Sequence, residues 1–249
     1  MSAKNNGFQF KQFYIQHSQC AMKVGTDSIM LGSWIEPGSA QQILDIGSGS
    51  GLLAIMLAQK SASQARILGI DIDQDAVNQA QINASNTIWA DRLAFASIPL
   101  QTLCKHTEHA QLYDLIVSNP PYFAVNSTSN QQNQHAAHSK RINARQTTTL
   151  DALSLLYAVN THLADAGCFY CVLPSENVEF FVAHASSLGL HNNAQLQVQS
   201  RPDGKIVRVL LKFSRYFSCT QINRLTIYDQ GTHYSQAYID LCKAYYLRF

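Results

Sequence analysis

The chain has 249 residues, of which 46% are apolar and 14% charged, and its formal net charge is +2. This composition is typical of a globular protein with a folded core, and the mild basic balance permits a nucleic-acid partner without requiring one. Residues 1–7 lack the apolar stretch of a signal peptide, and no run reaches the roughly 18 apolar residues that a membrane span needs. We therefore expect a cytoplasmic protein without a membrane partner.

Short apolar runs rich in β-formers alternate with helical patterns between residues 41 and 215. The expected strands lie at 42–47, 66–72, 93–97, 114–121, 167–174 and 207–213, and the expected helices at 50–60, 75–85, 150–163 and 177–190. Such alternation predicts an α/β fold with a doubly wound, Rossmann-like and mostly parallel central sheet flanked by helices. Ligands of this fold bind beyond the carboxyl ends of the strands.

We expect one domain, with residues 41–215 as its core and residues 1–40 and 216–249 as extensions. The helical spacing of Tyr238, Leu241, Tyr245 and Tyr246 predicts a helix packed on the core.

Two pairs of residues have spacings found at metal sites. Cys168 and Cys171 fall in an expected buried strand, where residues three apart point to opposite faces of the sheet. His135 and His138 lie in a polar stretch with no nearby cysteine or carboxylate to complete a site. We therefore expect no metal.

The first expected strand ends in a glycine-rich turn. Gly47, Gly49 and Gly51 allow a sharp turn and a close approach of a ligand, although a tight strand-to-helix turn alone would also explain them. Asp45 precedes these glycines, and Asp71 ends the next strand, where a carboxylate can accept both hydroxyl protons of a ribose. The spacing G-x-G-x-G differs from the dinucleotide fingerprint and favours a nucleoside without a pyrophosphate.

A second motif lies at the end of the expected strand 114–121. Proline has no N–H for a strand ladder, so Pro120 and Pro121 hold Asn119 at the strand tip. The Asn119 side-chain oxygen and the Pro120 carbonyl can accept the hydrogens of an exocyclic amine and localise its lone pair. Tyr122 offers a ring on which a base can stack, and Pro121 and Phe123 would line the substrate pocket. A strand ended by prolines and plugged by aromatic residues is the alternative.

Together these motifs resemble the class I S-adenosylmethionine-dependent methyltransferases. Residues 45–51 are similar to their glycine motif, and residues 118–122 to the N-P-P-Y motif of the branch that methylates amino groups. The flanks 10–34 and 225–247 resemble bacterial tRNA adenine-N6 methyltransferases that act on a valine tRNA beside its anticodon. The resemblance implies N6-methylation of adenine 37, with S-adenosyl-L-methionine as cofactor and tRNA as partner. We expect a monomer.

The expected cofactor site combines these residues with others near the strand ends. Its members are Thr26, Asp45, Gly47, Gly49, Gly51, Asp71, Ile72, Ser97 and Asn119. Ser97 stands where related enzymes commonly place an acidic residue that holds the cofactor's adenine. Thr26 would close over the methionine end, although Thr26 or Asp27 could instead cap a helix.

The polar stretch 126–144 is expected to act on the substrate side. Lys140, Arg141 and Arg145 would contact the tRNA phosphates, and a solvated linker is the alternative. The family has His-Glu after Ala-Arg, whereas Gln146 and Thr147 stand here. A protein-glutamine N5-methyltransferase is an alternative function, because a glutamine amide presents the same two hydrogens. An idle RNA-binding or cofactor-sensing module is another.

Overall fold

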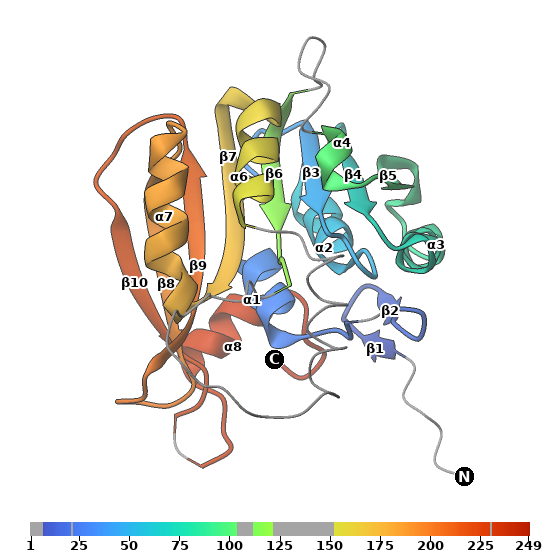
Figure 1. Cartoon of the computed structure of the whole chain (residues 1–249). Coiled ribbons are helices and arrows are strands. Elements are labelled where there is room, and N and C mark those ends of the chain that lie inside the picture. Colours follow the sequence, from blue (N-terminus) through green and yellow to red (C-terminus); the bar gives the residue numbers. More distant parts are fainter. Residues whose placement is uncertain (1–6, 21, 104–111, 122–151, 230) are drawn as a thin grey trace, which may run out of the picture.

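The computed structural model describes residues 7–20, 22–103, 112–121, 152–229 and 231–249, and its centre is a twisted sheet of eight strands (Figure 1). In chain order these strands are β3 (Gln42–Ile46), β4 (Arg66–Asp71), β5 (Leu93–Ser97), β6 (Tyr113–Ser118), β7 (Leu163–Pro174), β8 (His191–Gln199), β9 (Ile206–Ser214) and β10 (Gln221–Thr226). Their order in the sheet is β10-β8-β9-β7-β6-β3-β4-β5. Only the pairs β7-β9 and β8-β9 of this sheet are antiparallel, which confirms the expected mostly parallel α/β fold.

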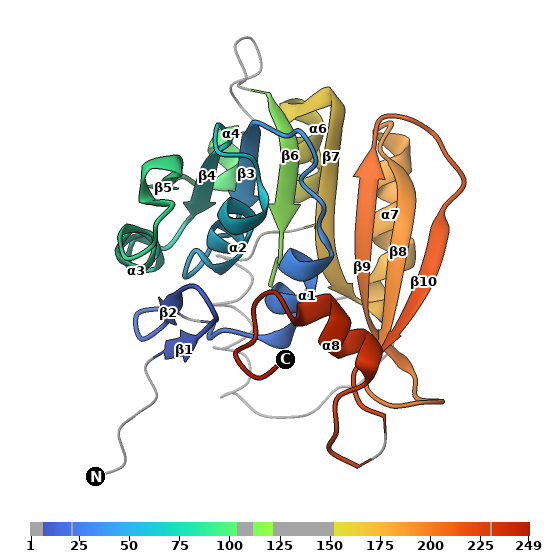
Figure 2. The same ribbon diagram turned by 180° about the vertical axis from the view of Figure 1, so that it is seen from behind.

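Helices cover both faces of the sheet, as expected for a doubly wound fold. One face carries α1 (Thr26–Trp34), α2 (Leu52–Lys60), α3 (Gln74–Ser85) and α8 (Gln236–Cys242), and the other carries α4 (Leu100–Leu103), α6 (Ala152–His162) and α7 (Val178–Ser187). Figures 1 and 2 show these two layers from opposite sides. Two 3-10 turns, η1 (Ala90–Arg92) and η2 (Ser175–Asn177), complete the connections.

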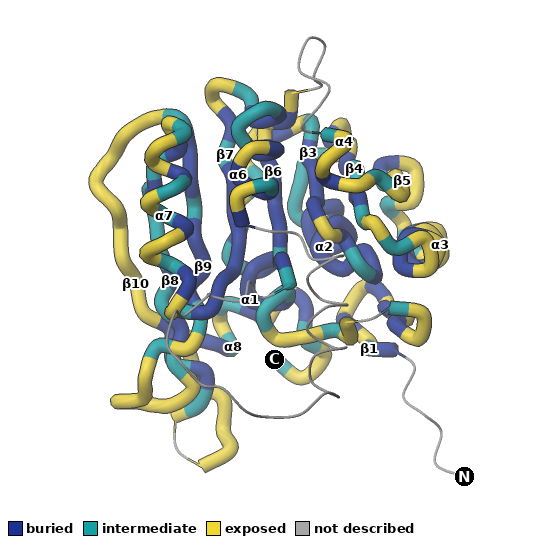
Figure 3. Tube along the Cα trace, viewed as in Figure 1, coloured by how far each residue is buried: buried dark blue, intermediate teal, exposed yellow. Residues whose placement is uncertain are grey.

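The central strands are apolar on both sides because both sides are covered. In β3, Ile43 belongs to the hydrophobic cluster under α2, while Leu44 and Ile46 belong to the cluster under α6. Continuous apolar runs are typical of such doubly covered parallel strands. Figure 3 shows the result, with buried strands between helices whose outer faces are exposed.

The cysteine pair behaves as the sequence predicted. Cys168 packs against the cluster under α1 and α2, and Cys171 is buried in the cluster under α6 and α7. Both thiols are free, and they face opposite sides of β7.

The sequence patterns missed four strands. The polar strands β8 and β10 lie at one side of the sheet, and β1 (Gly7–Gln9) pairs with β2 (Tyr14–Gln16) as a separate hairpin. Strand β8 buries Leu196 and Val198 but otherwise consists largely of Gln and Asn, which are not strand-forming residues. Backbone pairing with β9 and β10 on its two sides makes this segment a strand, although its own residues do not predict one.

Segments from the two expected extensions meet beside α1. Phe10 forms a β-bridge with Tyr246, and the Lys11 N–H donates to the Tyr245 carbonyl at 2.9 Å. We name the aromatic side chains that pack here the aromatic seam, which consists of Phe8, Phe10, Phe13, Tyr238, Tyr245 and Tyr246. Helix α8 ends at Cys242, so the expected helix is shorter than the tyrosine spacing suggested. The extension 216–249 also supplies β10 to the central sheet.

Candidate active site

The glycine-rich turn joins β3 to α2 at the carboxyl edge of the sheet. The φ angles of Gly47, Gly49 and Gly51 are +74°, +52° and +78°, a region that other residues rarely adopt. A Cβ at Gly47 or Gly49 would meet nothing within 4 Å, whereas one at Gly51 would lie 2.9 Å from the Phe95 ring. The first two glycines therefore border open space where a ligand can approach the backbone, and the third also permits close packing.

Asp45 lies under this turn with its side chain fully buried. Its Oδ2 accepts a hydrogen bond from the Ala54 N–H at 3.1 Å, and its Oδ1 has no partner within the described residues. Burial raises the pKa of Asp45 to about 7, and the nearby Asp71 carboxylate adds to the rise. A buried carboxylate oxygen without a partner suits a site for a ligand that brings a positive charge.

Asp71 ends β4 beside the same turn. Its Oδ2 accepts from the Gly49 N–H at 2.8 Å, and its Oδ1 accepts from the Asp73 N–H at 3.0 Å. Each carboxylate oxygen keeps a second lone pair, so the group can still accept from a pair of ligand hydroxyls. The backbone of the glycine turn thus orients the carboxylate that the sequence assigned to a ribose.

Two other expected cofactor residues lie next to Asp71. Ser97 is its register partner on β5, and the Ser97 hydroxyl donates to the Ile72 carbonyl at 3.3 Å. The Ile72 side chain is 54% exposed at this strand end. An exposed isoleucine at this position can pack on the flat face of a base.

Asn119 follows the last residue of β6 directly, as the two prolines predicted. The Ser118 hydroxyl donates to the Ile46 carbonyl at 2.8 Å, which ties the tips of β6 and β3 together. Pro120 is buried, and Pro121 is half-buried. The Asn119 Nδ2 donates to the Ser28 hydroxyl of α1 at 2.8 Å. Sequence reasoning missed Ser28, because a serine in the first turn of a helix carries no signal of its own.

Thr26 begins α1 and is exposed, whereas Gly25 occupies the N-cap position without a side-chain hydrogen bond. The alternative prediction, in which Thr26 or Asp27 caps this helix, is therefore wrong. Asp27 instead accepts from the Arg208 Nε at 2.9 Å, which joins α1 to β9.

The segment that precedes α1 lies beside the glycine turn. Asn83 of α3 donates from Nδ2 to the carbonyls of Gln16 and Ser50, both at 2.8 Å. Burial raises the pKa of Cys20 to about 11, and the Asp71 and Asp73 carboxylates contribute to the rise. The site thus has the N-terminal segment as one wall and the strand ends as its floor.

Several predicted site residues lie outside the described residues. They are Tyr122, Phe123, Lys140, Arg141 and Arg145, together with His135 and His138. Within the described ranges, no group of three or more His, Cys, Asp and Glu side chains could hold a metal ion. No helix in those same ranges is long and apolar enough to cross a bilayer.

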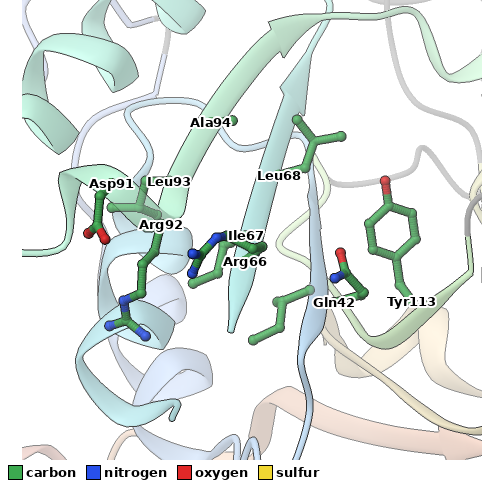
Figure 4. Close-up of a pocket in the computed structure, with 10 residues that line it drawn as sticks. Gln42, Arg66, Ile67, Leu68, Asp91, Arg92, Leu93, Ala94 and Tyr113 are labelled. Atoms are coloured by element: carbon green, nitrogen blue, oxygen red, sulfur yellow. The ribbon is translucent and has the colours of Figure 1, made fainter. Parts of the chain in front are cut away.

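A pocket of about 280 Å³ lies at the opposite edge of the sheet (Figure 4). It is formed at the amino ends of the strands, where Gln42, Arg66, Leu93 and Tyr113 begin β3, β4, β5 and β6. Ligands of open parallel sheets bind beyond the carboxyl ends, so this pocket is separate from the candidate active site.

Comparisons with known proteins agree with this geometry. Residues 18–162 match the family model described as "Methyltransferase small domain". A curated tRNA1(Val) (adenine(37)-N6)-methyltransferase from Pseudoalteromonas atlantica is 46% identical, with 99% of this chain and 100% of the relative covered. A relative of the same name from Escherichia fergusonii is 38% identical, with 98% and 96% covered.

Solved structures share the fold at low sequence identity. A predicted O-methyltransferase from Agrobacterium tumefaciens superposes with a TM-score of 0.65 at 15% identity, over 88% of this chain and 96% of that one. The ribosomal protein L11 methylase from Lactobacillus delbrueckii gives 0.52 at 18% identity, over 76% and 78%.

Proposed function

Because the chain belongs to the family of the tRNA1(Val) (adenine(37)-N6)-methyltransferases, we propose that it methylates N6 of adenine 37 in tRNA1(Val), with S-adenosylmethionine as the methyl donor. The observation that carries the proposal is the position of Asn119 and Pro120 at the tip of β6, beside the glycine turn. We place the reaction in the cytoplasm.

The residues at the strand ends fit a nucleoside cofactor with a cationic methionine end. Asp71 would accept from the ribose hydroxyls, Ile72 and Ser97 would border the adenine, and the turn at Gly47 and Gly49 would approach the methionine part. Asp45 lies below that turn and would supply negative charge under the cation. When bound, S-adenosylmethionine supplies a methyl group that its sulfonium charge already activates.

The chain's own contribution to the chemistry is to hold the target amine. The lone pair of an adenine amine is delocalised into the ring, so the amine is a weak nucleophile. Acceptance of its two hydrogens by the Asn119 Oδ1 and the Pro120 carbonyl would localise the lone pair toward the methyl group. Because the reaction is an in-line displacement, the geometry of these rigid groups supplies much of the rate, with reacting atoms roughly 3 to 3.5 Å apart. The surplus proton of the product amine leaves to water.

Apart from Pro121, the substrate side rests on residues outside the described ranges. We propose that Tyr122, with Pro121 and Phe123, stacks on an adenine swung out of the anticodon loop, where an unpaired base is least costly to extrude. Lys140, Arg141 and Arg145 would contact the RNA phosphates.

The decisive experiment supplies methyl-labelled S-adenosylmethionine together with a tRNA1(Val) transcript and total cellular protein. We expect label in N6-methyladenosine of the transcript and none in a matched transcript with guanine at position 37. Label confined to protein glutamine would replace the proposal with the N5-methyltransferase alternative. No transfer to either acceptor, with the cofactor bound, would favour an idle module and overturn the proposal.

A further inference from the structure

We propose that Ser28 is a positioning residue for the methyl transfer, because its hydroxyl anchors the Asn119 amide beside the substrate amine. This inference rests on the proposed function. The Asn119 Nδ2 donates to the Ser28 hydroxyl at 2.8 Å, and this is a direct side-chain contact between α1 and the tip of β6.

The orientation of the amide decides whether the site can work. An asparagine side chain carries an acceptor oxygen and a donor NH2 group on nearly equivalent arms. With the nitrogen on Ser28, the oxygen is turned away from Ser28 and remains available to accept a hydrogen from the substrate amine. A rotation of about 180° around the Cβ–Cγ bond would place NH2 hydrogens against amine hydrogens, and the site would lose an acceptor.

Ser28 can hold the Asn119 amide in place because α1 is held at both ends. Near its start, Asp27 accepts from the Arg208 Nε of β9 at 2.9 Å. Near its end, the Lys60 ammonium donates to the Ser33 carbonyl at 2.7 Å and also to the Ile35 carbonyl. A contact made from a helix fixed in this way is more precise than one made from a loop.

The first test compares three variants with the wild type in tRNA methylation. Ser28→Ala should lower kcat about tenfold, the size expected for one lost positioning hydrogen bond, with tRNA and cofactor affinities unchanged. Ser28→Thr keeps a hydroxyl and should restore most of the rate. Ser33→Ala removes another hydroxyl from α1, one that does not contact Asn119, and should leave kcat unchanged. A rate for Ser28→Ala within twofold of wild type would overturn the inference.

A double-mutant cycle separates positioning from general damage to α1. If Ser28 acts through Asn119, Ser28→Ala should have no further effect on kcat in an Asn119→Ala background. Multiplication of the two losses would show that Ser28 acts elsewhere and would overturn the inference.

A readout independent of turnover keeps the inference testable if the proposed function fails. In NMR spectra of the full chain, the Asn119 Nδ2 hydrogens should show nuclear Overhauser contacts to the Ser28 Hβ atoms. The Asn119 amide resonances should shift in Ser28→Ala and not in Ser33→Ala. A wild type that does not methylate tRNA but shows these contacts would refute the proposed function alone. An amide oxygen facing Ser28 would refute the inference alone.

Discussion

The glycine-turn edge of the sheet and the aromatic seam are built in opposite ways. At the edge, Gly47 and Gly49 border open space, and the Asp45 Oδ1 is buried without a described partner. In the seam, Tyr238 and Tyr245 are buried to 0% and 1% exposure, and their hydroxyls reach Tyr246 and the Met56 carbonyl. The comparison teaches that the edge leaves a buried carboxylate oxygen beside open space, whereas the seam pairs the hydroxyls of its buried tyrosines.

The largest expected effect is on stability, from Tyr238→Ala in the seam. Loss of a fully buried aromatic side chain should lower the free energy of unfolding by about 3 to 5 kcal/mol. Denaturant unfolding measures this loss, and Tyr238→Phe, which removes only the hydroxyl pair with Tyr246, should lose about 1 kcal/mol. A much lower kcat for the folded Tyr238→Ala protein than for wild type would contradict the purely structural role of the seam.

The next effect is on rate, from Asn119→Ala at the edge. Removal of an acceptor that matters most in the transition state should lower kcat by about 10² to 10³, with tRNA affinity little changed. Single-turnover kinetics and tRNA binding curves separate the two quantities. A loss under tenfold would show that Asn119 is not the amine acceptor.

A smaller effect is expected on cofactor affinity from Asp71→Ala. The variant loses a charged acceptor for the ribose, and such hydrogen bonds contribute about 1.5 to 3 kcal/mol. Calorimetry should therefore show weaker binding of S-adenosylmethionine by a chain that still folds, with a lower melting temperature because the Gly49 and Asp73 N–H groups lose their acceptor. Asp73→Asn is the matched control, because it removes a neighbouring carboxylate but keeps an N-cap residue for α3. Equal affinities for wild type and Asp71→Ala would remove Asp71 from the site.

The smallest effect concerns the pH dependence of stability through Asp45. Its pKa is raised from 3.8 to about 7, so the folded chain keeps a proton that the unfolded chain has already lost. The contribution of Asp45 to the free energy of unfolding is therefore greatest below about pH 4, falls as pH rises toward 7, and stays low above pH 7.

The corresponding variant is Asp45→Asn, which cannot ionise. Its melting temperature relative to wild type should rise by a few degrees between pH 5 and pH 8, because only the wild type loses stability over this range. The buried amide nitrogen that the change introduces lowers the melting temperature equally at both pH values. Thermal scans of the ligand-free proteins at both pH values measure the difference. A difference that is constant with pH would show that Asp45 titrates normally.

The two regions also differ in how far the sequence predicts them. The βα alternation and the proline stop after Ser118 are local features, and the structure confirms the strands and helices that they indicate. Strand β10 and the bridge between Phe10 and Tyr246 depend on partners far away in the chain, so no local sequence pattern predicts them. The contact of Ser28 with Asn119 joins residues 91 positions apart and is hidden for the same reason. The roles of the predicted site residues stay predictions.

The seam has a consequence for how the chain is made. Lys11 donates to the carbonyls of Lys243 and Phe249, at sequence separations of 232 and 238 residues. During synthesis on a ribosome, at about 5 to 20 residues per second, the hairpin at residues 7–16 is made well before its partners at residues 243–249. The parallel strands can pair earlier, whereas the seam joins segments of high sequence separation, and such contacts form slowly. The nascent chain would therefore expose Phe8, Phe10 and Phe13 until Tyr245 and Tyr246 have been made, and in that interval a chaperone could bind the hairpin.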